Sequence, residues 1–255
     1  MSIGLFNKYK YLDSIDAIYW INLKRSTDRK KHMEEILKNI NIQNTRIDAI
    51  DGKNIDLSKY VYNLDYKRGS KYEYACLLSH LKAIKTFLES NNNIALILED
   101  DITLEFSNFW DKSISTVIKG APPNWDILML SYTQLFPVKN LYSKYNVDKN
   151  RITGAISYLI NKKGARKLLN SIDIINQKYY FEDDLEPKSD VYIYAKLNTY
   201  CYKYPYFTYR TNNTSTIHDS HLTYHLLAKR VLVRLWKDYH SSKYYSWFNW
   251  IKHNT

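Results

Sequence analysis

The chain has 255 residues, of which 45% are hydrophobic and 25% are charged, values typical of a globular protein with a substantial core. Its formal net charge of +11 favours anionic ligands such as nucleotide phosphates, anionic lipid or nucleic acid, without choosing among them. Two cysteines, Cys76 and Cys201, are too few for a disulfide framework or a metal knuckle, so we expect free thiols.

We expect no membrane-spanning segment and no signal peptide. The apolar run over residues 15–23 is short and is interrupted by Asp16 and Asn22. These features predict a cytoplasmic protein that is soluble or at most peripherally attached to a membrane.

Predicted strands and helices alternate along the first half of the chain. Residues 15–23 form a buried-strand pattern, and Ser26 is suited to cap a helix that runs to about residue 39. A short strand follows near residues 45–50, and apolar side chains at helical spacing predict a second helix over residues 73–89. This alternation predicts an α/β layered fold.

The most informative strand pattern covers residues 94–98. It is continuously apolar, which is typical of a strand buried on both faces, and it ends at Glu99, Asp100 and Asp101. The later predictions are strands over 125–130 and 154–160, a surface loop over 139–150, a helix over 162–171, an aromatic strand or extended chain over 198–210, and a helix from about 222 to 236.

The acidic triplet at residues 99–101 indicates a candidate metal site. In open α/β sheets, ligands bind at the carboxyl ends of the strands. Adjacent carboxylates repel one another unless a cation is present, and Mg²⁺ or Mn²⁺ prefers oxygen ligands and can bridge to a diphosphate. The alternative is an acidic turn that caps the next segment and needs no metal.

Further motifs surround the triplet in a defined order: INLKRS with Arg29 at 21–29, AIDG at 49–52, ACLLSH at 75–80, ILEDD at 97–101, and GAISYLINKKGARKLL at 154–169. This series resembles glycosyltransferase family 25, which includes lipooligosaccharide and collagen galactosyltransferases. Asp190 and residues 215–217 stand where the family has later motifs, so the resemblance spans about residues 15–220. Ala75, in place of a usual glycine, and the acidic segment 182–186 depart from the family pattern.

The resemblance implies a GT-A-type, Rossmann-like nucleotide-sugar-binding domain over residues 1–221, followed by a helical C-terminal tail over residues 222–255. It also implies a UDP-sugar donor, a divalent metal (Mn²⁺ or Mg²⁺) and inversion at the anomeric carbon. The transferred sugar would be a hexose, galactose or glucose, and the acceptor a hydroxyl of a glycan, a glycolipid or a collagen-like protein.

Under this interpretation, the donor would be bound by side chains that follow the predicted strands or lie on the second helix: Asn22, Leu23, Arg25, Ser26, Arg29, Asp51, Ser79, His80, Glu99 and Asp100. The metal would be bound by Glu99, Asp100, Asp101 and His218. Plainer roles stay open for several of these residues. Residues 22–29 can be a helix cap with solvated basic side chains, His80 can be structural, and His218 with His221 can form an exposed polar turn.

Inversion requires a carboxylate base near the acceptor hydroxyl. We predict that Asp190 is this base, because of its position in the motif series. Asp101 is a second catalytic candidate, and residues 182–184 are further alternatives. Asp190 could instead cap a helix at residues 191–194.

Basic side chains alternate with tryptophan and tyrosine in residues 222–255, a pattern that fits a helix lying on an anionic membrane surface. A helix packed on the domain is the alternative. Rival functions are a transferase with another donor or a retaining mechanism, and a catalytically inactive module that binds glycans or nucleic acid. We expect no nucleic-acid partner, because the sequence lacks a zinc knuckle, an RNP-type motif and a clear helix-turn-helix.

Overall fold

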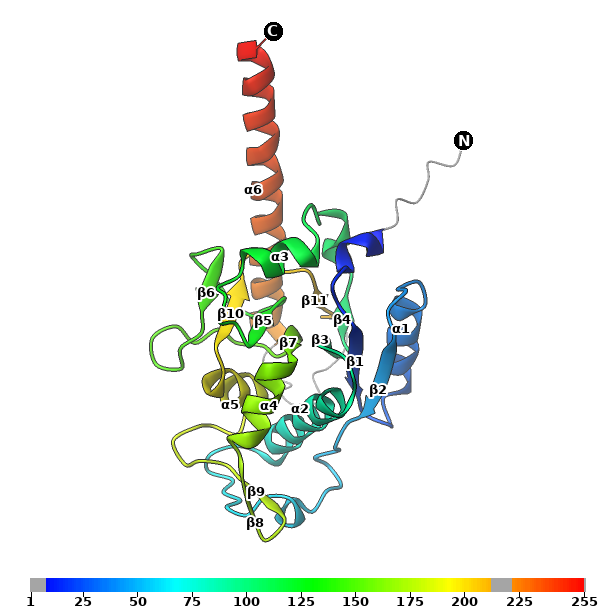
Figure 1. Ribbon diagram of the computed structural model, residues 1–255, viewed down its shortest axis with the longest axis vertical. Coiled ribbons are helices and arrows are strands. Elements are labelled where there is room, and N and C mark those ends of the chain that lie inside the picture. The colour runs from blue at the N-terminus through cyan, green and yellow to red at the C-terminus, as the bar shows by residue number, and fades with distance from the viewer. Residues whose placement is uncertain (1–7, 212–221, 255) are drawn as a thin grey trace.

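The computed structural model describes residues 8–211 and 222–254 (Figure 1). Within them, a central sheet has the strand order β2–β1–β3–β7–β5–β10–β6. Its strands are β1 (Ala17–Asn22), β2 (Asn44–Asp48), β3 (Ile94–Glu99), β5 (Ile127–Met129), β6 (Tyr142–Lys144), β7 (Ser157–Asn161) and β10 (Thr199–Tyr202). β7 and β6 run opposite to the other strands. The predicted α/β, Rossmann-like fold is confirmed.

The helices are α1 (Thr27–Leu37), α2 (Lys71–Glu89), α3 (Ile114–Gly120), α4 (Lys162–Asn170), α5 (Ser189–Lys196) and α6 (Leu222–Asn254). The chain crosses from β1 to β2 in one direction and returns from β2 to β3 in the other. Right-handed crossovers therefore place α1 and α2 on opposite faces of the sheet, as Figure 1 shows. α2 also packs against α4 and α5.

Local sequence explains the start and the packing of α2. Ser70 and Glu73 form a capping box, in which each side chain accepts a hydrogen bond from the backbone N–H of the other residue. Leu77, Leu81 and Ile84 then lie fully buried along one face of the helix. The four middle residues of β3 are equally buried because the strand has neighbours on both sides and helices above and below.

Several elements were not predicted. β6 lies within the segment that we expected to be a surface loop, and it pairs with β10 at the edge of the sheet. The other unpredicted elements include α3, the hairpin of β8 (Asp173–Ile175) and β9 (Lys178–Tyr180), and β4 (Ile102–Thr103), which pairs with β11 (Thr208–Tyr209) from the extended segment predicted over 198–210. Strands of two or three residues are too short to show an alternating pattern, so tertiary pairing alone defines them.

α6 continues past residue 236, where the helical pattern in the sequence ends, and runs on through the C-terminal tail to Asn254. Leu232 and Trp236 on its first half belong to the same core as the sheet, while the second half projects beyond the body of the molecule (Figure 1). Both cysteines are free, as expected. No helix among the described residues is both long enough and apolar enough to span a bilayer.

Candidate functional site

A pocket of about 610 Å³ lies at the carboxyl ends of β1, β2 and β3. The strand register brings these ends together, because Asn22 pairs with Asp48 and Ile21 pairs with Glu99. Strand order reverses at β1, and ligands bind at such points in open α/β sheets. The lining residues are Ile21, Leu23, Arg25, Arg29, residues 49–52, Tyr72, Ala75, Cys76, Ser79, His80, Glu99 and Asp100.

The structure thus gathers most of the predicted donor residues around one pocket. Asn22 and Ser26 are the exceptions, since neither lines it. Ser26 precedes α1, but its side chain makes no capping hydrogen bond; its backbone carbonyl accepts one from the Asn22 side chain instead.

Asp100 is the centre of a buried polar network beneath the pocket. Its Oδ2 accepts a hydrogen bond from Nδ2 of Asn22 at 2.6 Å, and its Oδ1 accepts one from Arg29 at 2.9 Å. Oδ1 of Asn22 in turn accepts a hydrogen bond from Nε of Arg46 at 2.9 Å. The network joins the ends of β1 and β3 to β2 and α1. Because both carboxylate oxygens of Asp100 already have partners, its main role is to fix this edge of the sheet.

Asp101, unlike Asp100, has a carboxylate oxygen without a hydrogen-bond partner among the described residues. This atom, Oδ1, is buried, and the Arg29 guanidinium lies 4.0 Å from Oδ2. Desolvation and the nearby Glu99 carboxylate raise the pKa of Asp101 to about 7. A buried carboxylate oxygen without a donor is costly, so this atom is suited to bind a cation.

His80 lies on α2 and is fully buried. Its Nδ1 is 3.0 Å from the hydroxyl of Tyr158, and its Nε2 is 3.2 Å from Oε1 of Glu99. The Tyr158 ring stacks on the imidazole, with centroids 5.9 Å apart. These contacts fix the orientation of the imidazole and aim it at the end of β3.

Two further contacts form the outer wall of the pocket. Nε of Arg25 lies 2.7 Å from Oδ2 of Asp51, and this hydrogen bond lowers the pKa of Asp51. The hydroxyl of Ser79 accepts a hydrogen bond from the backbone N–H of Ile50 at 2.8 Å, which ties the segment after β2 to α2. Arg25 is partly exposed at the pocket and can reach an anionic ligand.

A second pocket, of about 1010 Å³, adjoins the first, and Cys76 and Glu99 line both. Asp190, in the first turn of α5, lies in this second pocket. Its Oδ2 accepts a hydrogen bond from the backbone N–H of Gly154 at 2.8 Å. Desolvation nevertheless raises the pKa of Asp190, while the Gly154 N–H opposes that shift. The predicted base thus lies in a pocket joined to the predicted donor pocket through Glu99.

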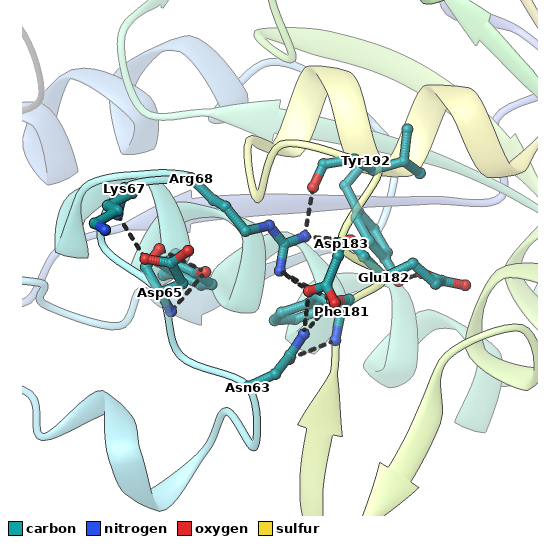
Figure 2. Close-up of polar contacts among 10 residues, drawn as sticks. Asn63, Asp65, Lys67, Arg68, Phe181, Glu182, Asp183 and Tyr192 are labelled. Carbon is teal, nitrogen blue, oxygen red and sulfur yellow. Dashed lines mark hydrogen bonds and ion pairs between the residues drawn. The ribbon is translucent and has the colours of Figure 1, made fainter.

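The acidic segment that departs from the family pattern is tied to the loop before α2 (Figure 2). The Arg68 guanidinium donates to the backbone carbonyls of Phe181, Glu182 and Leu185 and to Oδ1 of Asp183. Asn63 adds hydrogen bonds to Phe181 in both directions. This set of contacts, centred on Arg68 and Asn63, fixes the path of residues 181–185.

The Arg68 contacts affect both the alternative bases and Asp190. Glu182 binds the Tyr192 hydroxyl and the Lys196 ammonium on α5, and Asp183 is bound by Arg68. Neither lines the pocket that contains Asp190. The acidic segment therefore fixes α5, the helix that carries Asp190, and stays outside the pocket.

Sequence reasoning did not identify several residues that line the two pockets: Tyr72, Cys76, Glu73, Arg151, Lys188 and Tyr224. Cys76 lies four residues before His80 on a predicted helix, a spacing that could have identified it. Arg151 and Lys188 lie in loops, where no helical or strand spacing could identify them. His218 and His221 lie outside the described residues.

The fold and the paired pockets define an α/β protein with a pocket where the strand order of the sheet reverses. Residues 15–186 match the profile of glycosyltransferase family 25, described as LPS biosynthesis protein. This match covers more than half of the chain, and the chain belongs to glycosyltransferase family 25.

Curated relatives agree with this assignment. The chain is 30% identical to procollagen galactosyltransferase 1-B of Xenopus laevis over 179 residues, which are 62% of this chain and 28% of the relative. It is 25% identical to human procollagen galactosyltransferase 2 over 186 residues (66% and 30%), and 29% identical to a glycosyltransferase 25 family member of Drosophila melanogaster over 190 residues (65% and 31%). The matched region is thus under a third of the length of each of these relatives.

The network around Asp100 gives a stability prediction. Asn22→Ala removes one hydrogen-bond partner each from Arg46 and Asp100 and should lower the free energy of unfolding by about 1–3 kcal/mol. Urea unfolding of the purified protein measures this loss.

Asp48→Ala is the matched control, since the Asp48 side chain is 61% exposed and also pairs with Arg46. It should cost less than about 1 kcal/mol. Equal losses in the two variants would show that the Asn22 contacts add nothing beyond a surface ion pair.

Proposed function

We propose that this chain transfers a hexose, galactose or glucose, from a UDP-sugar to a hydroxyl of a glycan, a glycolipid or a collagen-like protein. The observation that carries the proposal is the junction of two pockets at Glu99. One pocket lies at the strand-order reversal, where nucleotides bind in α/β folds, and the other contains a desolvated carboxylate, Asp190. The names of the relatives support galactose and a collagen-like acceptor, and the family description supports a lipopolysaccharide-type acceptor.

In the donor pocket, Arg25 and Arg29 supply positive charge for a diphosphate. Glu99 and Asp101 are the residues that would hold Mn²⁺ or Mg²⁺, and the orphaned Oδ1 of Asp101 fits that role. When bound, such an ion would neutralise the negative charge of the diphosphate leaving group. Asp100 is less suited to this task because its two oxygens already bind Asn22 and Arg29.

In the second pocket, Asp190 accepts the proton of the acceptor hydroxyl as the oxygen attacks the anomeric carbon. The new glycosidic C–O bond forms while the bond from the anomeric carbon to the diphosphate oxygen breaks, and UDP leaves with the bonding electrons. Attack from the side opposite the leaving group inverts the configuration. A raised pKa makes Asp190 a stronger base than an ordinary aspartate.

A donor screen tests the activity. The purified protein with Mn²⁺ and a galactose- or collagen-type acceptor should release UDP from UDP-galactose or UDP-glucose, and EDTA should stop the release. If no UDP-sugar reacts or binds, while glycan or oligonucleotide raises the melting temperature, the chain is a binding module instead.

The assignment of Asp101 has a direct test in nucleotide binding. Mn²⁺ should raise the affinity of the wild type for UDP, and Asp101→Asn should abolish that gain by removing a charged ligand. Calorimetric titration with and without Mn²⁺ measures it. Asp148→Asn, which neutralises an exposed carboxylate elsewhere, should retain the full effect of Mn²⁺. A gain equal to that of the wild type in Asp101→Asn would contradict the assignment.

The assignment of Asp190 predicts a different kinetic result. Asp190→Asn should lower kcat by about 10²–10⁴-fold, because it removes general-base catalysis, with little change in UDP affinity. Asp184→Asn, in the exposed part of the acidic segment, should leave kcat near the wild-type value. A normal kcat in Asp190→Asn would place the base elsewhere.

We also propose that α6 contacts an anionic membrane surface. Arg230, Arg234 and Lys237 are exposed at helical spacing on one face, and they line a groove together with Leu226 and Val233. A stripe of basic and apolar side chains on one face suits the interface of an anionic bilayer. Such a contact would bring the catalytic pockets close to a lipid-linked acceptor.

Charge reversal tests this contact. The triple variant Arg230→Glu, Arg234→Glu, Lys237→Glu should lose most of its binding to phosphatidylserine vesicles in a sedimentation assay. The matched control reverses Lys38, Lys163 and Arg166, which are exposed on α4 or just after α1, so the net charge changes equally. If both triple variants bind equally well, α6 is not the membrane surface.

A further inference from the structure

Cys76, His80 and Glu99 form a cluster of three potential metal ligands at the junction of the two pockets. One ligand atom from each, the thiol Sγ, an imidazole nitrogen and a carboxylate oxygen, lies within 4.8 Å of the others. Among the described residues, this cluster brings together three different ligand types. It differs from the acidic triplet, which offers oxygen atoms alone.

The sequence and the fold together explain the cluster. Cys76 and His80 are four residues apart on α2, so their side chains lie on the same face of the helix. α2 packs against β1 and β3, and the carboxyl end of β3 carries Glu99 to that face. One ion can therefore contact two ligands from successive turns of the helix and a third ligand from the neighbouring strand.

The surroundings of His80 suit metal binding. When Nδ1 donates its hydrogen to the Tyr158 hydroxyl at 3.0 Å, the lone pair of Nε2 faces Glu99 and the centre of the cluster. A hydrogen bond from the distal ring nitrogen orients metal-binding histidines in general. Tyr158 therefore acts as the positioning residue for this ligand.

The cluster is also accessible and nearly the right size. Cys76 and Glu99 line both pockets, so a fourth coordination position would face the space where substrates meet. Tetrahedral zinc places its ligand atoms about 3.3–3.8 Å apart, so the cluster has to contract by about 1 Å. Rotation of the half-buried Cys76 and Glu99 side chains can supply that movement.

We propose that Cys76, His80 and Glu99 form a binding site for Zn²⁺ or a similar borderline-soft divalent cation. Sulfur and nitrogen ligands favour Zn²⁺ over the hard ions Mn²⁺ and Mg²⁺. An ion at this position engages Glu99 and occupies the junction of the pockets. Bound zinc therefore competes with the transfer reaction and acts as an inhibitor at a site that shares Glu99 with the acidic triplet.

Cobalt spectroscopy tests the site without any assay of activity. Co²⁺ added to the reduced, metal-stripped full chain should give a thiolate-to-cobalt charge-transfer band and intense visible bands typical of tetrahedral coordination, and Zn²⁺ should remove them. Cys76→Ala should abolish the charge-transfer band. Cys201→Ala is the matched control: it removes the other free cysteine, buried in β10, and should keep the band.

Tyr158→Phe tests whether Tyr158 orients His80 for metal binding or only supports the fold. It should weaken Co²⁺ binding by about 10-fold or more while leaving the charge-transfer band in place at saturation, because the ligands are unchanged. The proposal is wrong if the folded wild type shows no charge-transfer band. It is also wrong if the band persists in Cys76→Ala or disappears only in Cys201→Ala.

A second readout rests on the proposed function. Micromolar Zn²⁺ should inhibit sugar transfer by the wild type in the presence of Mn²⁺, and Cys76→Ala should be at least about 10-fold less sensitive, as expected from the loss of one of three ligands. The cobalt spectrum needs no substrate, so failure of the transfer assay and failure of the metal site are distinguishable. Equal zinc sensitivity of both proteins would contradict inhibition at this site.

Discussion

The contact on which the rest of the site depends is the buried carboxylate of Asp100, held between Asn22 and Arg29. A charge in a low-dielectric interior requires partners, and here those partners come from two different elements, β1 and α1. Arg46 extends the network to β2. The positions of Glu99 and Asp101, which flank Asp100, are fixed by this arrangement, so one carboxylate is used for architecture and its two neighbours stay available to ligands.

The two pockets meet at the carboxyl end of β3. Glu99 belongs to both, and Asp190 enters the second pocket from α5. α5 in turn depends on Glu182, which binds Tyr192 and Lys196, and on the Arg68 contacts shown in Figure 2. Two groups of elements thus form the two pockets, which meet at the end of β3, a buried interior strand of the sheet.

The first half of α6 is part of the domain, and its second half projects from it. Trp236 packs in the core and donates a hydrogen bond to the Pro205 carbonyl, while Tyr239 and Lys243 bind Asp111. The exposed basic face lies on the side of the helix away from these contacts. One helix can therefore be fixed rigidly to the body of the domain and still present charge to an anionic surface.

The sequence by itself determined the fold class, the order of the long elements and most of the residues that line the pocket at the ends of β1, β2 and β3. Continuous apolar runs such as residues 94–98, and motifs that directly follow strands, are local signals, and parallel strands bring their carboxyl ends to one edge. Only the tertiary structure decided how the carboxylates divide their roles, because Asp100 and Asp101 are neighbours whose difference arises from Asn22, Arg29 and burial. The short strands, the Arg68 contacts and the approach of Cys76 to Glu99 likewise depend on residues far apart in sequence, which no local pattern encodes.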